Sequence, residues 1–156
     1  MPPAAVSGDL RALTERGRTP PMILPRVRDY MDTTVHTLRP ETGLMEAVDF
    51  LLAHHVTGAP VVNDANEVVG IVSEKDLLRL LAEGNDHQAP RGTVADYMTK
   101  KVTTVTPEMN IYFCAGLFLN DVVRRFPVVE RGRLVGAITR FDILRAIKAN
   151  LGAAAK

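Results

Sequence analysis

The chain has 156 residues, of which 46% are hydrophobic and 24% are charged, and its formal net charge is +1. This length and composition suit one compact domain or two small ones, and they exclude a wholly disordered chain. The small net charge predicts no strong attraction to nucleic acid or to an anionic membrane surface. The single cysteine, Cys114, excludes an intrachain disulfide and a thiolate zinc site, and it is typical of a protein of the reducing cytoplasm.

The charges are distributed unevenly along the chain, although their total is almost zero. Residues 1–26 have a net charge of +2, residues 27–91 of −6 and residues 92–156 of +5. The two halves that follow the first 26 residues therefore carry opposite charge. No apolar run approaches the roughly 20 residues that a membrane-spanning helix needs, so we expect no membrane association.

Residues 1–26 hold five of the ten prolines and are interpreted as an N-terminal arm. A short helix is predicted over residues 9–16, because Leu10 and Leu13 fall on one helical face. The prolines that follow remove backbone donors and prevent further helix. We expect an arm that is partly disordered or packs on a partner, and not a folded domain.

An internal repeat covers most of the remaining chain. Short motifs recur at a spacing of 67 residues and then, after a turn, of 66 residues: Asp29-Tyr30-Met31 and Asp96-Tyr97-Met98, Pro40 and Pro107, Pro60-Val61-Val62 and Pro127-Val128-Val129, Gly70-Ile71-Val72-Ser73 and Gly136-Ala137-Ile138-Thr139. A one-residue deletion in a turn explains the change of spacing, because turns tolerate length changes. The repeat predicts two copies of one structural unit.

Each copy reads as strand, helix, hairpin and second helix. The predicted strands are residues 35–38, 59–62 and 68–72 in the first copy and 102–105, 126–129 and 134–138 in the second. The first helix of each copy is expected to bury apolar residues at helical spacing: Leu44, Val48, Leu51 and Leu52, then Ile111, Ala115, Leu117, Phe118 and Val122. The closing helices are predicted over residues 73–83 and 139–150.

The most informative motif is a hydroxyl residue followed three positions later by aspartate, at Ser73 and Asp76 and again at Thr139 and Asp142. Each motif follows a predicted buried strand and opens a predicted helix. One interpretation is a capping box, which stabilises a helix start and needs no ligand. The other is a binding site, because helix N-termini attract phosphate and an aspartate can accept hydrogen bonds from two ribose hydroxyls. The two interpretations are compatible.

The tandem unit, the apolar-Pro-Val-Val strands and the Gly-apolar-apolar-Ser/Thr-x-x-Asp segments resemble a pair of CBS domains (cystathionine-β-synthase domains), also called a Bateman module. The resemblance covers about residues 27–150. It implies an α+β fold in which two β-α-β-β-α repeats pack sheet to sheet about a pseudo-twofold axis. We name residues 27–90 repeat 1 and residues 91–150 repeat 2, and we expect residues 151–156 to be a tail.

The resemblance also implies two clefts between the paired sheets, each able to bind an adenosine-containing ligand: AMP, ADP, ATP, S-adenosylmethionine or NAD(H). Asp76 and Asp142 would then hold ribose, and Ser73 and Thr139 would contact ribose or phosphate. The residues that would line the slots or flank adenine are Thr34, Val35, Gly58, Ala59, Pro60, Lys101, Val102, Arg125, Phe126 and Pro127.

The two repeats differ in charge at the expected phosphate position. Repeat 2 carries three arginines there: Arg124, Arg125 and Arg140. A planar guanidinium suits phosphate oxygens, although Arg124 and Arg125 are also compatible with solvated surface charges. Repeat 1 offers only Lys75, beside the acidic Glu74. We therefore hypothesise that the second site prefers a charged phosphate ligand, whereas the first binds weakly or stays empty.

Two weaker candidates have structural interpretations. His54 and His55 end the first predicted helix of repeat 1, and adjacent residues do not share a helical face. We interpret them as a last-turn pair that interacts with the helix dipole. Cys114 lies within an apolar helix and is expected in the core.

Nothing in the sequence argues for catalysis, since we find no nucleophile triad, phosphate-binding glycine loop or metal-ligand spacing. The favoured hypothesis is a cytoplasmic regulatory module that senses an adenine nucleotide and signals to an unidentified effector protein through the geometry of a homodimer. The opposite charges of the repeats favour a head-to-tail dimer. The alternatives are a ligand-free structural dimerisation module and, in last place because aromatic residues do not interleave with the basic ones, a nucleic-acid-binding protein.

Overall fold

The computed structural model describes residues 24–83 and 91–154. Nearly all of the N-terminal arm, including the helix predicted over residues 9–16, and residues 84–90 at the end of repeat 1 lie outside the described residues. The described elements in chain order are α2 (Val27–Tyr30), α3 (Leu44–His54), β1 (Gly58–Val62), β2 (Val68–Ser73), α4 (Glu74–Glu83), α5 (Val94–Tyr97), α6 (Ile111–Leu119), β3 (Arg125–Glu130), β4 (Arg133–Thr139) and α7 (Arg140–Ala154).

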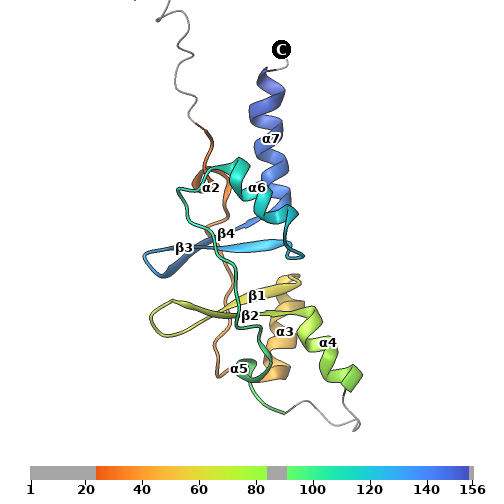
Figure 1. Ribbon diagram of the computed structural model, residues 1–156. Helices are drawn as coiled ribbons and strands as arrows, with labels where there is room; N and C mark the ends of the chain where they lie inside the picture. The colour runs from red at the N-terminus through yellow and green to blue at the C-terminus, as the bar shows by residue number, and fades with distance from the viewer. Residues whose placement is uncertain (1–23, 84–90, 155–156) are drawn as a thin grey trace, which may run out of the picture.

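Two antiparallel hairpins form the centre of the molecule, and helices cover their outer sides (Figure 1). Strand β1 pairs with β2 in repeat 1, and β3 pairs with β4 in repeat 2. Helices α3, α4 and α5 lie beyond the first hairpin, and α2, α6 and α7 lie beyond the second. This is the α+β arrangement, packed sheet to sheet, that the resemblance implied.

The hairpin turns explain the change of spacing between the repeats. The first turn spans residues 63–67, and the Asn63 side chain accepts hydrogen bonds from the N–H groups of Ala65 and Glu67. Between the equivalent pairs Val62–Val68 and Val129–Leu134, the second hairpin has four residues where the first has five, and its central residues Arg131 and Gly132 both have positive φ angles. Such angles are typical of tight two-residue hairpin loops. The deletion therefore lies in a turn, as predicted.

Each short helix at the start of a repeat packs in the core of the other repeat. Val27 of α2 is fully buried among residues of α6, β3, β4 and α7, whereas Val94 of α5 is fully buried with α3, β1 and β2. The repeated prolines support this exchange. The Arg28 N–H donates to the carbonyl of Pro107 at 2.9 Å, and at the equivalent positions the Ala95 N–H donates to the carbonyl of Pro40 at 2.9 Å. Packing therefore crosses the boundaries drawn on the sequence.

Two recurring glycines allow the exchanged segments to cross the hairpins. Asp32 exchanges two backbone hydrogen bonds of 2.9 Å with Ala137, and Thr99 exchanges the equivalent pair of bonds with Ile71. A Cβ added at Gly136 would lie 2.8 Å from the carbonyl oxygen of Asp32, and one added at Gly70 would lie 2.5 Å from the sulfur of Met98. The close approach of two chain segments therefore explains why glycine stands at both positions.

An exposed cluster of ion pairs also ties α2 to repeat 2. The Arg28 guanidinium donates to Glu108 at 2.6 and 2.9 Å and to Glu130 at 3.3 Å, and Arg26 pairs with Glu108 as well. Hydrogen bonds from Arg28, and then from Arg26, hold the pKa of Glu108 below its usual range. Because all these side chains are solvent-exposed, they orient α2 more than they stabilise it.

The first predicted strand of each repeat is shorter than expected. Residues 35–38 and 102–105 each make a single parallel bridge, from Leu38 to Val61 and from Val105 to Val128. A proline follows two residues after each bridge and has no N–H with which to extend the ladder. Each sheet therefore consists of a two-stranded hairpin with one bridging residue at its edge.

Three local predictions about the helices are wrong. Leu52 is 68% exposed, because α3 turns its neighbour Leu51 into the core and places Leu52 on the outer face. Val122 is 92% exposed, because α6 already ends at Leu119. Residues 151–154, expected in the tail, continue α7 to Ala154, since no proline interrupts it.

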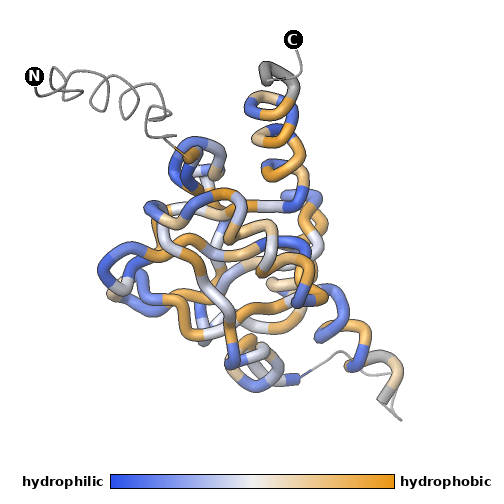
Figure 2. Tube along the Cα trace, turned by 45° about the horizontal axis from the view of Figure 1, so that its top comes forward, coloured by the Kyte–Doolittle hydropathy of each residue, from blue (hydrophilic) through white to orange (hydrophobic). Residues whose placement is uncertain are grey.

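Hydrophobic residues recur along α7, which projects from the body of the molecule (Figure 2). Four of them are between 41% and 70% exposed: Phe141, Leu144, Ile147 and Leu151. Among the described residues, no helix combines the length and the hydrophobicity required to cross a membrane. Helix α7 thus presents an apolar face that the described chain does not cover.

Replacing Gly136 with alanine is expected to destabilise the protein by about 1–3 kcal/mol, because the added Cβ would press on the backbone of Asp32. Urea unfolding followed by circular dichroism measures the change. Gly116→Ala is the matched control, since a Cβ there meets no atom within 4 Å. That control should be stabilising by about 0.5–1 kcal/mol, because alanine favours helix. Equal effects of the two substitutions would contradict the crossing.

Candidate functional site

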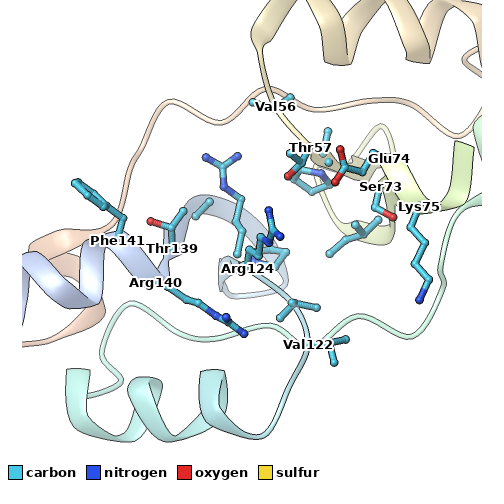
Figure 3. Close-up of a pocket in the computed structure, with 18 of the residues that line it drawn as sticks. Val56, Thr57, Ser73, Glu74, Lys75, Val122, Arg124, Thr139, Arg140 and Phe141 are labelled. Carbon is cyan, nitrogen blue, oxygen red and sulfur yellow. The ribbon is translucent and has the colours of Figure 1, made fainter. Parts of the chain in front are cut away.

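A cavity of about 800 Å³ lies between the two repeats, where α4 and α7 begin (Figure 3). The hydroxyl–Asp segments of both repeats reach it, so the two expected clefts meet in one continuous cavity. Ten residues predicted for the site line it: Gly58, Ala59, Pro60, Ser73, Lys75, Arg124, Arg125, Pro127, Thr139 and Arg140.

The cavity has the pseudo-twofold symmetry of the repeat. Most lining residues have an equivalent, 66 or 67 positions away, that also lines the cavity: His55 and Val122, Val56 and Val123, Thr57 and Arg124, Gly58 and Arg125, Pro60 and Pro127, Ile71 and Ala137, Ser73 and Thr139, Glu74 and Arg140, Lys75 and Phe141. The sequence interpretation did not include Glu74 or Phe141 among the site residues. The repeat spacing would have found them, since their equivalents, Arg140 and Lys75, were already included.

Both hydroxyl–Asp motifs form the predicted capping box. The N–H and the hydroxyl of Ser73 donate to the carboxylate of Asp76 at 2.9 and 3.1 Å, and the Asp76 N–H donates back to the hydroxyl at 3.3 Å. Thr139 and Asp142 make the same three bonds at 2.8, 3.0 and 3.2 Å. These bonds stabilise the helix starts and hold Ser73 and Thr139 at the cavity wall.

The two aspartates themselves do not line the cavity. Asp76 is only 8% exposed, and it also accepts a hydrogen bond of 3.3 Å from the hydroxyl of Thr99. Asp142 forms an ion pair of 3.0 Å with Arg145, which also donates to the carbonyl of Tyr30. Ribose binding by these carboxylates stays a prediction, and a ribose would have to compete with the partners they already have.

Five other predicted residues lie outside the cavity lining. Phe126 is 1% exposed and packs against Phe118, with ring centroids 4.3 Å apart, so its side chain belongs to the core of repeat 2. The other four stand in the segments that lead to the parallel bridges: Thr34, Val35, Lys101 and Val102. Their expected contact with adenine stays a prediction.

The two walls of the cavity carry unequal charge. Repeat 2 contributes Arg124, Arg125 and Arg140, whereas repeat 1 contributes one cation, Lys75, and one anion, Glu74. Within residues 24–83 and 91–154, no side-chain hydrogen bond or ion pair involves Arg124 or Arg125, and Arg140 makes one bond of 3.3 Å to a backbone carbonyl. A guanidinium group that has no carboxylate partner can donate two parallel hydrogen bonds to two oxygens of one phosphate.

The two histidines at the end of α3 face different surroundings, as their adjacency predicted. His54 stacks on the ring of His36, with ring centroids 3.8 Å apart. His55 adopts the left-handed conformation at the C-cap of α3 and lines the cavity. The sequence placed this residue at the helix end but did not indicate its position at the cavity.

The described part of the chain shows no arrangement for metal binding and holds no reactive thiol. Among these residues, no three His, Cys, Asp or Glu side chains gather closely enough to hold a metal ion. Cys114 is fully buried in the core of repeat 2, and burial raises the pKa of its thiol to about 11. Cys114 is therefore structural, as its apolar neighbours predicted.

Comparison with known proteins identifies the family. The CBS domain model matches residues 27–83 and matches again over residues 94–149. The chain therefore belongs to the CBS-domain family and contains a tandem pair of CBS domains. The repeat, the fold and the shared cavity all agree with this assignment.

One similar protein is MJ1225 of Methanocaldococcus jannaschii, which is 35% identical over 121 residues. The match covers 78% of this chain but 42% of MJ1225, so the chain spans less than half the length of that relative.

Two similar solved structures contain adenosine compounds. The complex of CBSX2 with AMP has a TM-score of 0.69 and 32% identity, and it covers 83% of this chain and 98% of its own; CBSX2 is a protein of Arabidopsis thaliana. The CBS pair of MJ0100, in complex with 5-methylthioadenosine and S-adenosylmethionine, has a TM-score of 0.68 and 25% identity over 85% of this chain and 99% of its own.

Cys114 is expected to react very slowly with Ellman's reagent at pH 8 in the native protein, because a thiol with a pKa of about 11 is almost entirely protonated there. The unfolded protein in urea is the control and should react quickly. Since the native pKa lies above the reference value of 9.0, the thiol contributes stability that is complete below pH 9 and is lost as the pH rises toward 11. Rapid labelling of the native protein would contradict the buried position.

Proposed function

We propose that the protein is a ligand-sensing regulatory module that binds an adenosine-containing nucleotide in the cavity between its CBS repeats. One observation carries this proposal: near the start of α7, one cavity is lined by Thr139 and by three arginines that, among the described residues, pair with no carboxylate. The complexes of CBSX2 with AMP and of MJ0100 with S-adenosylmethionine support it by similarity. AMP, ADP and ATP are the favoured ligands, and S-adenosylmethionine and NAD(H) are the alternatives.

The size and the walls of the cavity suit such a ligand. A volume of about 800 Å³ falls in the range of roughly 300–1,000 Å³ that is common for small-molecule sites. Apolar side chains supply surface for a purine ring, and they come from both repeats: Val56, Pro60, Ile71, Val123, Pro127 and Ala137. The arginines of repeat 2 supply charge for phosphate. An apolar wall beside a cluster of cations fits an amphipathic, phosphorylated molecule.

A ligand-free structural module is the competing function. Its support is that, among the described residues, every buried side-chain nitrogen and oxygen already has a hydrogen-bond partner. The capping boxes need no ligand to be complete. The arginine cluster favours binding over this alternative, because three like charges on one cavity wall repel each other unless an anion lies between them.

We further propose that the module acts as a homodimer in the cytoplasm and transmits the bound state to an effector protein instead of catalysing a reaction. The exposed apolar residues of α7 offer a surface that a second copy can cover. The net charges of −6 and +5 on the two halves favour a head-to-tail arrangement, in which repeat 1 of one copy meets repeat 2 of the other. A ligand shifts such a dimer only if it binds one arrangement more tightly than another.

A thermal-shift panel with AMP, ADP, ATP, S-adenosylmethionine and NADH tests ligand binding. A ligand present at 100 times its dissociation constant stabilises the native state by about 2.7 kcal/mol, so at least one nucleotide should raise the melting temperature clearly. Adenosine without phosphate should raise it less, because it cannot reach the arginines with a charged group. No shift with any member of the panel would favour the ligand-free module.

Variants of the arginines locate the site. Arg124→Ala and Arg125→Ala should each weaken nucleotide binding about tenfold or more, because each removes a charge-assisted hydrogen bond. Calorimetric titration measures the affinity. Arg133→Ala is the matched control, since Arg133 is an exposed cation of the same repeat outside the cavity lining. Arginines are preferred to Asp142 for this test because Asp142 also caps α7. Equal losses in all three variants would refute the assignment.

Sedimentation velocity tests the dimer. The wild-type chain should sediment as a dimer, and Leu144→Glu on the exposed face of α7 should shift it toward monomer without unfolding it. Thr104→Glu, at an exposed position of repeat 2 outside α7, makes the same change of charge and is the matched control. A wild-type chain that sediments as a monomer at all concentrations would exclude the proposed mode of signalling.

A further inference from the structure

The pseudo-twofold symmetry of the cavity creates two geometrically equivalent positions for a phosphate group. One lies where Ser73 precedes α4, and the other lies where Thr139 precedes α7. Both helix starts have the same capping bonds within 0.1 Å of each other, so the backbone does not distinguish the two positions. Any preference between them must come from the side chains.

The residue that follows the hydroxyl residue has opposite charge at the two positions. Glu74 directly follows Ser73 in repeat 1, and Arg140 directly follows Thr139 in repeat 2. Both line the cavity, and Figure 3 shows them on opposite sides of it. The residues three positions before the prolines also differ in charge, since the neutral Thr57 of repeat 1 is equivalent to Arg124 of repeat 2. The repeat 2 position therefore attracts phosphate, whereas the repeat 1 position combines one anion with one cation.

The stability of α7 does not explain the presence of Arg140. A cation in the first turn of a helix opposes the helix dipole, whereas an anion such as Glu74 in the equivalent place favours it. Among the described residues, the Arg140 side chain makes a single hydrogen bond, of 3.3 Å, to the Asp121 carbonyl, and Arg140 is exposed at the cavity. Residues that break a local rule without a structural gain are expected at functional sites. Arg140 thus points to an anionic ligand at this position.

We infer that the cavity binds one phosphorylated ligand per chain, with its phosphate held by the arginines of repeat 2, and that Glu74 excludes phosphate from the equivalent position in repeat 1. Glu74 is then a specificity-determining residue, which sets both the stoichiometry and the orientation of the ligand. This inference rests on the proposed nucleotide binding and adds to it the number of ligands and the residue that limits it.

Isothermal titration with AMP tests the inference through its stoichiometry. The wild-type protein should bind one AMP per chain. The double variant Thr57→Arg with Glu74→Arg gives repeat 1 two of the cations of repeat 2 and should bind two. Gly58 is left unchanged, because a Cβ there would lie 3.0 Å from the carbonyl oxygen of Val72. Circular dichroism and the melting temperature verify that each variant folds.

Two control variants isolate the role of Glu74. Thr57→Arg alone keeps the anion and should still bind one AMP. Thr57→Arg with Glu46→Arg has the same net charge as the double variant, but Glu46 lies on α3 outside the cavity lining, so it should also bind one. Two AMP molecules per wild-type chain, two in either control, or one in the double variant would each overturn the inference.

The variant Arg140→Glu gives a second test, because it should lower the affinity for AMP and raise the stability of the ligand-free protein. AMP affinity should fall at least about tenfold, because a cation at the phosphate is replaced by an anion. The melting temperature of the ligand-free protein should rise, because an anion now occupies the first turn of α7. Unchanged affinity would overturn the role of repeat 2. If wild-type protein bound no nucleotide of the panel, both the proposed function and this inference would fall, whereas two sites per chain would remove only the inference.

Discussion

The exchange of the short helices α2 and α5 is the constraint on which the rest of the structure depends. Val27 lies at the start of repeat 1 but packs in the core of repeat 2. Val94 lies at the start of repeat 2 but packs in the core of repeat 1. Neither core is closed by its own contiguous segment, so the pair forms one folding unit from two small cores that would be marginal alone. The crossing itself depends on the absence of a Cβ at Gly70 and Gly136, where the two chain segments touch.

This crossing also places the site. The two hairpins lie face to face (Figure 1), and residues at the starts of α4 and α7 line the same cavity. Asp76 and Asp142 lie behind the cavity wall, where their carboxylates cap the helices and fix the hydroxyls of Ser73 and Thr139. The aspartates thus serve stability directly, and the polar groups left at the cavity surface are hydroxyls and charged side chains. A ligand would meet a wall that is already rigid, which lowers the entropy lost on binding.

The sequence was sufficient for the fold and for about half of the cavity lining, because a repeat of fixed spacing identifies equivalent positions and the resemblance to a CBS pair implies how they are arranged. It revealed the hairpins, the capping boxes and ten of the lining residues. It did not reveal the helix exchange, since spacing shows that Val27 and Val94 are equivalent but not which core each one enters. Hydrophobic periodicity also misplaced Leu52, because a helix on the outside of a small sheet buries a narrow face. The histidine at the C-cap, His55, gave no signal of its place in the cavity, because only its backbone geometry brings it there.

The near-zero net charge has two separate physical origins. Three of the ten basic residues in positions 92–156 line the cavity, whereas Glu74 is the acidic residue of repeat 1 that lines it. On the cavity wall, repeat 2 is therefore represented by three cations, whereas repeat 1 is represented by one anion beside one cation, Lys75. The two repeats share the capping bonds and the crossing bonds, whereas the charged residues of the cavity wall differ between them. The proposed phosphate preference therefore rests on the differences between Thr57 and Arg124 and between Glu74 and Arg140, while the shared residues serve the structure.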